Sequence, residues 1–456
     1  MPPYDYDLLV IGGGGSGGFT AATTALKTGA RVAMVEAGRL GGLCILAGCM
    51  PSKTLLHHAA QLKDQGPAAR RHHPAVMARK RTVVEFLAGK REEAVAAKQK
   101  QGLVVIPGRA RLAEPHTVEV EGRHLTADKI VVATGSVEMV PPLEGLRESG
   151  YLDSRSLLEL DELPASVVVL GGGALALEMA QYLVRMGVET SIVQRSPHLL
   201  SSEAPEVGRT LAEALAAEGA RIYTHTALER IERDPGGGRV VHFRHQGRPT
   251  RVSAQEVLLA LGRRPNTAGL GLEEAGVELE RGAVKVDRFM RTSQPHVFAA
   301  GDVTGVRMVV NLAVLQGEIA GYNATHPQAM REIDDRVLPQ AVYTDPQFAR
   351  VGLSRTECER AGLDFAEATY KLSGLGVTRT YPQPPQGFMT MRAERKSRRI
   401  LGAEIVAPEA SLLIHEVAVA MQLNATPHDI AAIPYAHPCL SELVNLCAGR
   451  LARALG

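Results

Sequence analysis

The chain has 456 residues, 45% of them hydrophobic and 22% charged, which is ordinary for a globular protein of about three domains. Its 51 Lys and Arg residues nearly match its 49 Asp and Glu residues, so the charge gives no reason to expect a nucleic-acid or membrane partner. The sequence contains no run of about 18 apolar residues, so no membrane span is predicted. Five cysteines and an amino terminus that does not resemble a signal peptide predict a cytoplasmic protein.

A dinucleotide-binding unit is predicted at the amino terminus. Residues 6–11 form an apolar strand that runs into a glycine-rich loop, and the pattern then predicts a helix over 19–28 and a second strand over 31–35. Glu36 closes that strand and is expected to accept hydrogen bonds from adenosine ribose hydroxyls.

Three glycines of the loop are each expected to have a different structural role. Gly12 permits the tight turn, Gly14 lets the backbone approach a pyrophosphate, and Gly17 lets the helix pack on the strand. The phosphates then lie at the positive end of the helix dipole.

Two cysteines follow this unit, Cys44 and Cys49, with four residues between them. A disulfide spans so short a segment only when the segment is tightly wound, and this one follows the nucleotide-binding unit closely enough to lie against a bound cofactor. The alternatives are two free thiols or half of a metal site. Because Cys358, Cys439 and Cys447 are scattered singly, a metal site is not expected. The spacing therefore predicts a redox pair.

The region between residues 78 and 136 is predicted to hold one charged helix and three strands. The helix covers 78–101 and is interpreted as a solvated element with Glu–Lys pairs along one face. The strands cover 103–109 and 117–121, and a buried strand over 130–136 ends in a turn.

The dinucleotide pattern then repeats, with a strand over 166–170, glycines at 171–173, a helix over 177–186 and a strand over 189–193. Two units predict two dinucleotides. The second strand is followed by Arg195 where the first unit has a carboxylate, and an arginine there favours the 2′-phosphate of NADPH over NADH. The alternative is a solvated arginine.

Two further strand ends are candidate ligand sites. A strand over 257–261 precedes Gly262, and a strand over 296–300 precedes Asp302. Asp302 is placed to meet a polyol hydroxyl at the carboxyl end of a parallel strand, although a helix cap is the alternative. From residue 337 onward, the pattern changes to an α+β module without a phosphate loop.

Taken together, these motifs resemble those of the flavoprotein disulfide reductases, the family of dihydrolipoamide dehydrogenase, glutathione reductase and mercuric reductase. The resemblance covers essentially the whole chain. It is carried by GGLCxxxGCxPSK at 41–53, ATGS at 133–136, GGGxxxxE at 171–178, GRxPNT at 262–267, AAGD at 299–302 and HPxLSE at 437–442.

The resemblance implies an α/β fold with two Rossmann-like domains, which bind FAD and NAD(P), and an α+β dimerisation domain at the carboxyl terminus. The FAD-binding domain is expected over 1–145 and 265–336, the NAD(P)-binding domain over 146–264 and the interface domain over 337–456. Family membership further implies a homodimer that uses FAD with NADPH or NADH.

Site residues carry over position by position. Cys49 is implied as the thiolate against the flavin and Cys44 as the thiol that exchanges with substrate. Lys53 and Glu178 are implied to pair beside the flavin. His437, reaching in from the partner subunit, is implied as the acid/base, oriented by Glu442. The expected cofactor contacts are Gly12, Gly14, Gly17, Glu36, Lys53, Thr134, Gly135, Gly171, Gly173, Arg195, Gly262 and Asp302.

Several residues depart from the family patterns. Tyr435 stands where dihydrolipoamide dehydrogenases carry His, and Cys439 adds a thiol beside His437. Mercuric reductases usually end with two adjacent cysteines, whereas this chain has only Cys447 near its end. We therefore expect a dihydrolipoamide dehydrogenase-like enzyme acting on a disulfide or dithiol. The alternatives are a mercuric ion reductase-like enzyme and a flavoprotein redox switch for a protein partner.

Overall fold

The computed structural model describes residues 3–456, which form two compact units. Among the described residues, the first unit contains 3–54, 75–140 and 262–335, and the second contains 55–74, 141–261 and 336–456. The second unit thus joins the second glycine-rich region to the carboxyl-terminal region, so the expected four-part division stays a prediction.

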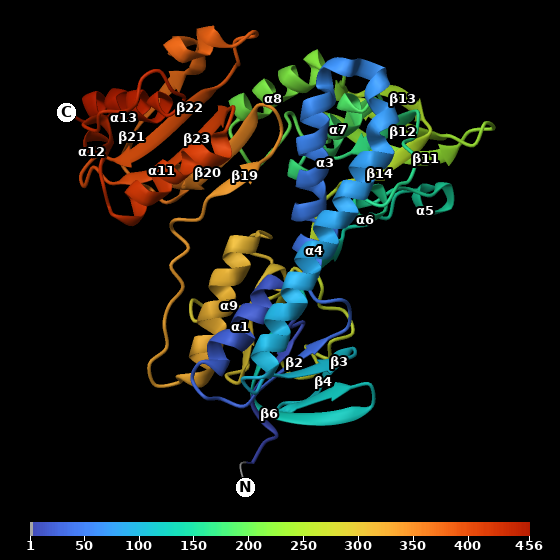
Figure 1. Cartoon of the computed structure of the whole chain (residues 1–456), viewed down its shortest axis with the longest axis vertical. Coiled ribbons are helices and arrows are strands. Elements are labelled where there is room, and N and C mark those ends of the chain that lie inside the picture. Colours follow the sequence, from blue (N-terminus) through green and yellow to red (C-terminus); the bar gives the residue numbers. More distant parts are fainter. Residues whose placement is uncertain (1–2) are drawn as a thin grey trace. The chain divides into compact units, whose positions relative to one another are not determined.

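A parallel sheet forms the centre of the first unit (Figure 1). Its strands run in the order β3-β2-β1-β6, β18 lies beside β6, and antiparallel β5 and β4 extend the sheet beyond β6. The bounds are β1 Tyr6–Ile11, β2 Val32–Glu36, β3 Val104–Pro107, β4 Ala110–Glu114, β5 Thr117–Val120, β6 Arg123–Val132 and β18 Val297–Ala299. Because β1, β2, β6 and β18 are mutually parallel, their carboxyl ends share one edge, where open α/β sheets bind ligands.

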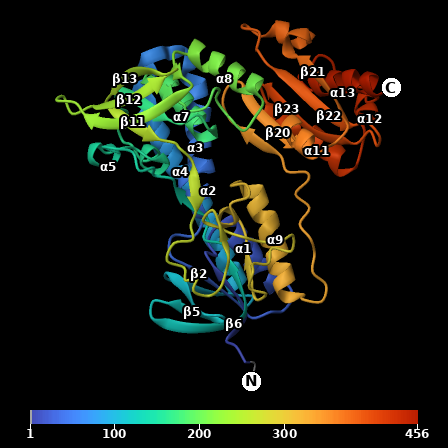
Figure 2. The same ribbon diagram turned by 180° about the vertical axis from the view of Figure 1, so that it is seen from behind.

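Helices α1 (Ser16–Leu26) and α9 (Val310–Thr325) lie side by side in this unit (Figure 2). A Cβ atom on Gly317 of α9 would lie 2.2 Å from the Gly17 carbonyl oxygen, so the two backbones touch directly. Gly17 itself faces α9, and a Cβ atom there would lie 3.0 Å from the Ala313 carbonyl oxygen. A Cβ atom on Gly17 would also lie 3.7 Å from the Ala300 carbonyl oxygen, directly after β18, so the expected role of Gly17 in packing its helix on the strand stays a prediction. Gly18 makes a closer approach to the glycine-rich loop, because a Cβ atom on Gly18 would lie 2.3 Å from the Gly12 carbonyl oxygen.

The second unit contains a parallel sheet in the order β10-β9-β8-β14, with α7 crossing between β8 and β9. The bounds are β8 Ser166–Leu170, α7 Ala174–Arg185, β9 Glu189–Val193, β10 Arg221–Tyr223 and β14 Glu256–Leu259. Both predicted strands match, while the helix begins three residues earlier than predicted. A three-stranded antiparallel sheet was not predicted, formed by β11 Thr226–Arg233, β12 Arg239–His245 and β13 Arg248–Ala254.

The carboxyl-terminal part of this unit is a five-stranded antiparallel sheet in the order β19-β20-β23-β22-β21. Its strands are β19 Gln340–Val342, β20 Gln347–Gly352, β21 Phe365–Lys371, β22 Phe388–Glu394 and β23 Ile400–Ala407. Helices α11 (Ala410–Gln422) and α13 (Glu442–Leu455) pack on the sheet and share one apolar core with it. This arrangement confirms the predicted α+β module.

The remaining elements connect these sheets. The helices are α2 Gly42–Ala47, α3 Cys49–Leu62, α4 His73–Gln99, α5 Leu146–Ser149, α6 Ser154–Leu157, α8 Pro205–Ala217, α10 Arg355–Arg360 and α12 Pro427–Ala431. Short strands are β7 Ser136–Glu138, β15 Arg263–Pro265, β16 Leu279–Glu280 and β17 Ala283–Val284, and 3-10 turns cover Lys63–His72, Asp302–Thr304, Leu372–Gly374 and Gly376–Thr380.

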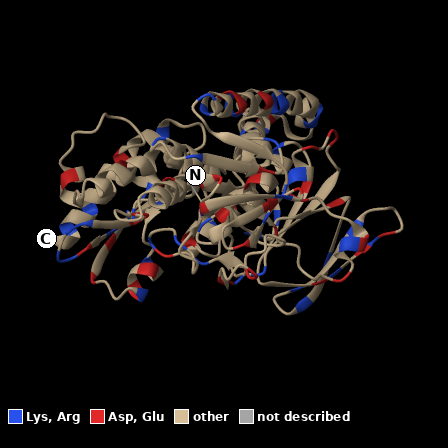
Figure 3. Ribbon diagram, turned by 90° about the horizontal axis from the view of Figure 1, so that it is seen from below, with Lys and Arg blue, Asp and Glu red and all other residues tan. Residues whose placement is uncertain are grey.

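Acidic and basic residues are interspersed over the ribbon rather than segregated (Figure 3). Within residues 3–456, no helix combines the length and the apolar character needed to cross a bilayer. The same range holds no cluster of three or more His, Cys, Asp or Glu residues arranged for a metal ion.

Candidate redox and cofactor site

The two cysteines of the predicted redox pair lie in consecutive helices. Cys44 is in α2, and Cys49 is the first residue of α3 after a break at Gly48. Both are thiols in this structure, and the side chain of Cys44 is hydrogen-bonded to that of Cys49. This hydrogen bond, and then burial, raise the pKa of Cys44, while the nearby charge of Lys53 acts in the opposite direction. The tightly wound segment that a disulfide requires is therefore present.

The amino end of α3 favours negative charge on Cys49. The helix has 14 residues, and its macrodipole places partial positive charge at the first turn. A thiolate at such a position is stabilised relative to the thiol. The two sulfurs are consequently unequal, because Cys49 begins a helix of 14 residues, whereas Cys44 lies in the first turn of a helix of only six.

The loop that leads into α2 is fastened to α4. The Arg39 guanidinium contacts Glu85 with Nη1–Oε1 and Nη2–Oε2 distances of 2.7 and 2.8 Å, and its Nε lies 3.2 Å from Glu92. At the start of α2, a Cβ atom on Gly42 would lie 2.7 Å from the Cα atom of Gly15, so α2 abuts the first glycine-rich loop. The redox pair is thus held between the dinucleotide loop and α4.

The first glycine-rich loop has the geometry expected of a dinucleotide site. Gly12 has a φ of +84°, and a Cβ atom there would lie 2.6 Å from the Ala133 carbonyl oxygen, so only glycine fits. The Gly14 amide donates to Glu36 Oε2 at 2.8 Å, and the Gly38 amide donates to Oε1 at 2.9 Å. A carboxylate has about four acceptor positions, so Glu36 retains capacity for ribose hydroxyls.

The other predicted residues of this site meet at the same sheet edge. Thr134 and Gly135 follow β6, and Thr134 Oγ1 donates to the Asn266 carbonyl at 2.7 Å. Asp302 follows β18 and accepts a hydrogen bond of 2.6 Å from the Ser136 hydroxyl. Gly15, which precedes α1, has no side chain to cap the helix, so amides of the first turn remain for a phosphate. These residues fit an FAD molecule.

The second glycine-rich loop repeats the tight approach. Gly171 has a φ of +119°, and a Cβ atom there would lie 2.3 Å from the Ala260 carbonyl oxygen, whereas a Cβ atom on Gly173 would find open space. Gln194 is buried after β9, and Arg195 beyond it is exposed. Gly262 belongs to the first unit, where its carbonyl accepts from the Met139 amide at 3.0 Å.

Glu178 lies on α7 and is 3% exposed. Its Oε1 accepts a hydrogen bond of 2.9 Å from the Tyr343 amide. One turn later, Gln181 exchanges two hydrogen bonds with the Asp345 backbone, at 2.8 and 2.9 Å. Arg185 adds ion pairs to Glu218 and Asp345. This face of α7 therefore anchors the segment between β19 and β20 of the carboxyl-terminal sheet, a contact that the sequence did not predict.

His437 and Glu442 form the predicted pair. His437 Nδ1 lies 2.9 Å from Glu442 Oε1, and the Cys439 amide donates to Glu442 Oε2 at 3.0 Å. The hydrogen bond from His437 and the one from Cys439 lower the pKa of Glu442. The His437 side chain is 74% exposed, so Glu442 orients a ring whose other nitrogen is open to a partner.

The two cysteines near the carboxyl terminus differ. The Cys439 thiol is partly exposed and donates to the Ala436 carbonyl at 2.9 Å. Cys447 is buried in α13 against β21 and β22, where burial raises its pKa to about 12. Tyr435 donates to Glu416 at 2.9 Å, and burial followed by this hydrogen bond raises the pKa of Tyr435.

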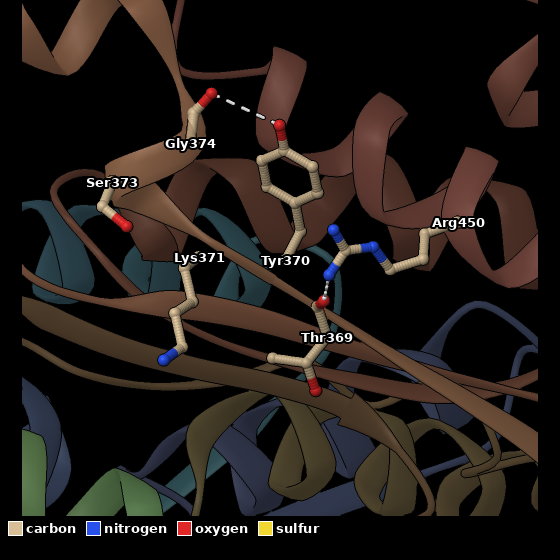
Figure 4. A pocket seen from close by; sticks show the side chains of 6 residues that line it. All are labelled: Thr369, Tyr370, Lys371, Ser373, Gly374 and Arg450. Atoms are coloured by element: carbon tan, nitrogen blue, oxygen red, sulfur yellow. Dashed lines mark hydrogen bonds between the residues drawn. The ribbon is translucent and has the colours of Figure 1, made fainter.

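One pocket of about 370 Å³ lies at the outer strand of the carboxyl-terminal sheet (Figure 4). The Arg450 guanidinium lies 5.0 Å from the centre of the Tyr370 ring and donates to the Thr369 carbonyl at 2.6 Å. None of the predicted site residues lines this pocket. Its lining residues are Thr369, Tyr370, Lys371, Ser373, Gly374 and Arg450.

Comparison with known proteins agrees with this geometry. The family described as pyridine nucleotide-disulphide oxidoreductase matches residues 6–317, and its dimerisation domain matches residues 338–447. A dihydrolipoyl dehydrogenase of Thermus scotoductus is 34% identical over 450 residues, which cover 96% of this chain and 95% of that protein. A mercuric reductase of Streptomyces lividans is 34% identical over 460 residues, which cover 97% of this chain and 95% of that protein.

A solved structure is similar over nearly the whole chain. The HOCl-induced flavoprotein disulfide reductase RclA from Escherichia coli superposes with a TM-score of 0.85 at 29% identity, over 97% of this chain and 99% of that one. The chain therefore belongs to the pyridine nucleotide-disulphide oxidoreductase family of flavoproteins. Members of this family use FAD and NAD(P)H as cofactors.

Proposed function

We propose that this protein is a homodimeric, FAD-dependent oxidoreductase that passes two electrons between a nicotinamide nucleotide and a dithiol or disulfide, with a dihydrolipoyl group as the substrate. The observation that carries the proposal is the hydrogen-bonded pair of thiols at Cys44 and Cys49, on helices that hold both sulfurs in contact. When bound, FAD supplies hydride chemistry with the nicotinamide nucleotide.

The chain's own residues carry the sulfur chemistry. With the pair as a disulfide, a substrate thiolate attacks the Cys44 sulfur, the Cys44–Cys49 bond breaks, and Cys49 leaves as a thiolate. The second substrate thiolate then attacks the substrate sulfur of the mixed disulfide and releases Cys44. The substrate departs as a disulfide, and its two electrons remain on the reduced pair. Reversing the steps reduces a substrate disulfide.

His437 is proposed to move the protons of these steps. Its Nδ1 is held by Glu442, which leaves Nε2 to take a proton from a substrate thiol and to return it. The same pair occurs in the dihydrolipoamide dehydrogenase pattern, which favours that substrate class. Because the imidazole is largely exposed on its own chain, we propose that it works in the site of a second copy.

An apolar stripe on α11 supports the homodimer. Leu412, Val419 and Leu423 recur at seven and four residues along the helix and are 65%, 59% and 73% exposed. Covering large apolar side chains stabilises an association by roughly 1.5–3 kcal/mol each. Together with the matched dimerisation domain, this stripe points to a second copy of the chain.

NADPH is the proposed nucleotide. Arg195 follows β9, at the strand end where an acid would bind the ribose of NAD, and its exposed guanidinium suits a 2′-phosphate.

Mercuric ion reduction is less favoured, although mercuric reductases are among the relatives. Soft thiolates collect such an ion, and Cys447 is a buried thiol whose pKa is raised to about 12. Cys439 alone remains accessible near the carboxyl terminus.

Turnover assays test the proposal. The FAD-loaded protein is assayed with dihydrolipoamide, glutathione disulfide and mercuric ion, each with NADP(H) and NAD(H). We expect turnover with the lipoyl pair, lost in Cys44→Ser and reduced about 100-fold or more in His437→Gln. Rapid reduction of the pair by NADPH without cycling on any of the three substrates would instead identify a redox switch.

A further inference from the structure

An arginine with one buried, unpaired guanidinium nitrogen lies near the redox pair and was not singled out by the sequence motifs. Arg91 is on α4, a helix interpreted from sequence as solvated. Its guanidinium carbon lies 4.5 Å from the centre of the Phe19 ring, and its Nη1 is buried with no hydrogen-bond partner within residues 3–456. A buried donor without an acceptor is costly, and such groups in native structures call for an explanation.

Two contacts place this part of α4 near the start of α2. Glu92, the residue after Arg91, accepts a hydrogen bond from Arg39, which lies three residues before α2. Phe19 lies one turn into α1, and its amide donates to the carbonyl of Gly15, the residue whose Cα atom lies against Gly42 at the start of α2. The guanidinium over Phe19 therefore lies next to the helix that carries Cys44.

The charges of the neighbouring residues are already neutralised. Lys90 pairs with Glu93 at 2.7 Å, and Glu92 pairs with Arg39. In the described chain, Arg91 has no carboxylate partner of its own. Burial lowers its pKa, and the charge that opposes this effect is that of the Cys44 sulfur. The titratable groups that act on Cys44 from α3 are Cys49 and Lys53, and from α4 the charge of Arg91 interacts with the Cys44 sulfur.

We propose that Arg91 is a positioning residue that stabilises the negative charge on the Cys44 sulfur during thiol–disulfide exchange. The inference rests on the proposed function, in which Cys44 carries that charge in both directions. When a substrate disulfide is reduced, the Cys44 thiolate attacks one substrate sulfur, the substrate S–S bond breaks, and the other sulfur leaves and takes a proton. When a dithiol is oxidised, Cys44 is the leaving sulfur of the mixed disulfide. A nearby cation lowers the energy of the thiolate in each case.

The test is the pH profile of Cys44 alkylation. The reduced, FAD-loaded protein is treated with iodoacetamide between pH 5 and 10, and modified Cys44 is quantified by peptide mass spectrometry. Arg91→Gln keeps a planar group over Phe19 and removes the charge. We expect it to slow alkylation at neutral pH about tenfold and to move the midpoint of the profile upward. Arg91→Lys is expected to restore most of the rate.

A matched control is Lys90→Gln, which removes the adjacent cation of α4 and is expected to leave the profile unchanged. Thermal melting and flavin absorbance verify that each variant is folded and loaded, and Arg91→Met replaces Arg91→Gln if that variant does not fold. An unchanged profile in the uncharged variant, or no rescue by Lys, overturns the inference. A shifted profile without turnover of any disulfide by the wild-type protein would contradict the proposed function but leave the charge effect of Arg91 standing.

Discussion

The two glycine-rich units share a backbone design and differ in how the second strand ends. In each unit, the first glycine packs against a carbonyl oxygen after a neighbouring strand, Ala133 for Gly12 and Ala260 for Gly171. The first unit then ties its loop to Glu36, whereas the second ends its strand at Gln194 and Arg195. One turn geometry thus serves both units, and we propose that the residue at the strand end sets which ribose each one accepts.

The largest effect is expected from a substitution that disrupts the turn shared by both glycine-rich units. Gly171→Ala forces a Cβ atom to within 2.3 Å of a backbone oxygen at a φ of +119°, so we expect a loss of roughly 3 kcal/mol in stability. Gly173→Ala is the matched control, because its Cβ atom enters open space, and it is expected to change stability by less than about 1 kcal/mol. Thermal unfolding followed by circular dichroism measures both. Equal melting temperatures for the two variants would refute the account of the turn.

The next largest effect is expected from a substitution of Glu36, the acid at the strand end of the first glycine-rich unit. Glu36→Gln removes the charge that holds the Gly14 and Gly38 amides and that is proposed to bind ribose hydroxyls. Hydrogen bonds to a charged group contribute about 1.5–3 kcal/mol, so we expect FAD affinity to fall about tenfold or more. Release of FAD, followed by flavin fluorescence, gives the affinity. Glu119→Gln, which alters only a surface ion pair with Arg111, should behave as the wild type.

Exchanging the strand end of the second unit should change nucleotide preference. Arg195→Glu places an acid where the first unit has Glu36, and we expect the NADPH to NADH ratio of kcat/KM to fall about tenfold or more. Arg195→Lys keeps the charge and should retain the preference. If both variants leave the ratio at the wild-type value, Arg195 is only a solvated side chain.

A smaller, pH-dependent effect on stability is expected from His296, in the first of the two compact units. His296 precedes β18 and stacks on His116 with ring centres 4.2 Å apart, and burial, together with the charge of His116, lowers its pKa below 6.5. The folded state therefore binds fewer protons than the unfolded state below about pH 6.5, so stability is lost as the pH falls. The melting temperature of His296→Gln should decline less steeply between pH 7 and 5 than that of the wild type. Parallel curves would show that His296 does not contribute.

Local patterns predicted the elements that bind cofactors because their signals are short in sequence. The strands β1, β8 and β9 follow apolar runs next to glycines, and their predicted bounds differ from the structure by no residue. The pairing of His437 with Glu442 was also local, since only four residues lie between them.

Contacts between distant segments could not be read from the chain. Glu178 accepts from an amide 165 residues later, and nothing near either residue signals this bond. Arg91 was interpreted as part of a solvated helix because its neighbours pair on the surface, and only the packing of α4 against Phe19 shows that its Nη1 atom is buried. The three strands between residues 226 and 254 were missed because charged residues interrupt their apolar alternation.

The most direct test of the central claim is the long-wavelength absorbance of the FAD-loaded protein after anaerobic reduction with NADPH. If Cys49 is the thiolate that lies against the flavin, the wild type shows a charge-transfer band that Cys49→Ser lacks, while Cys44→Ser shows the band without added reductant. A wild-type spectrum that bleaches without such a band would contradict the account.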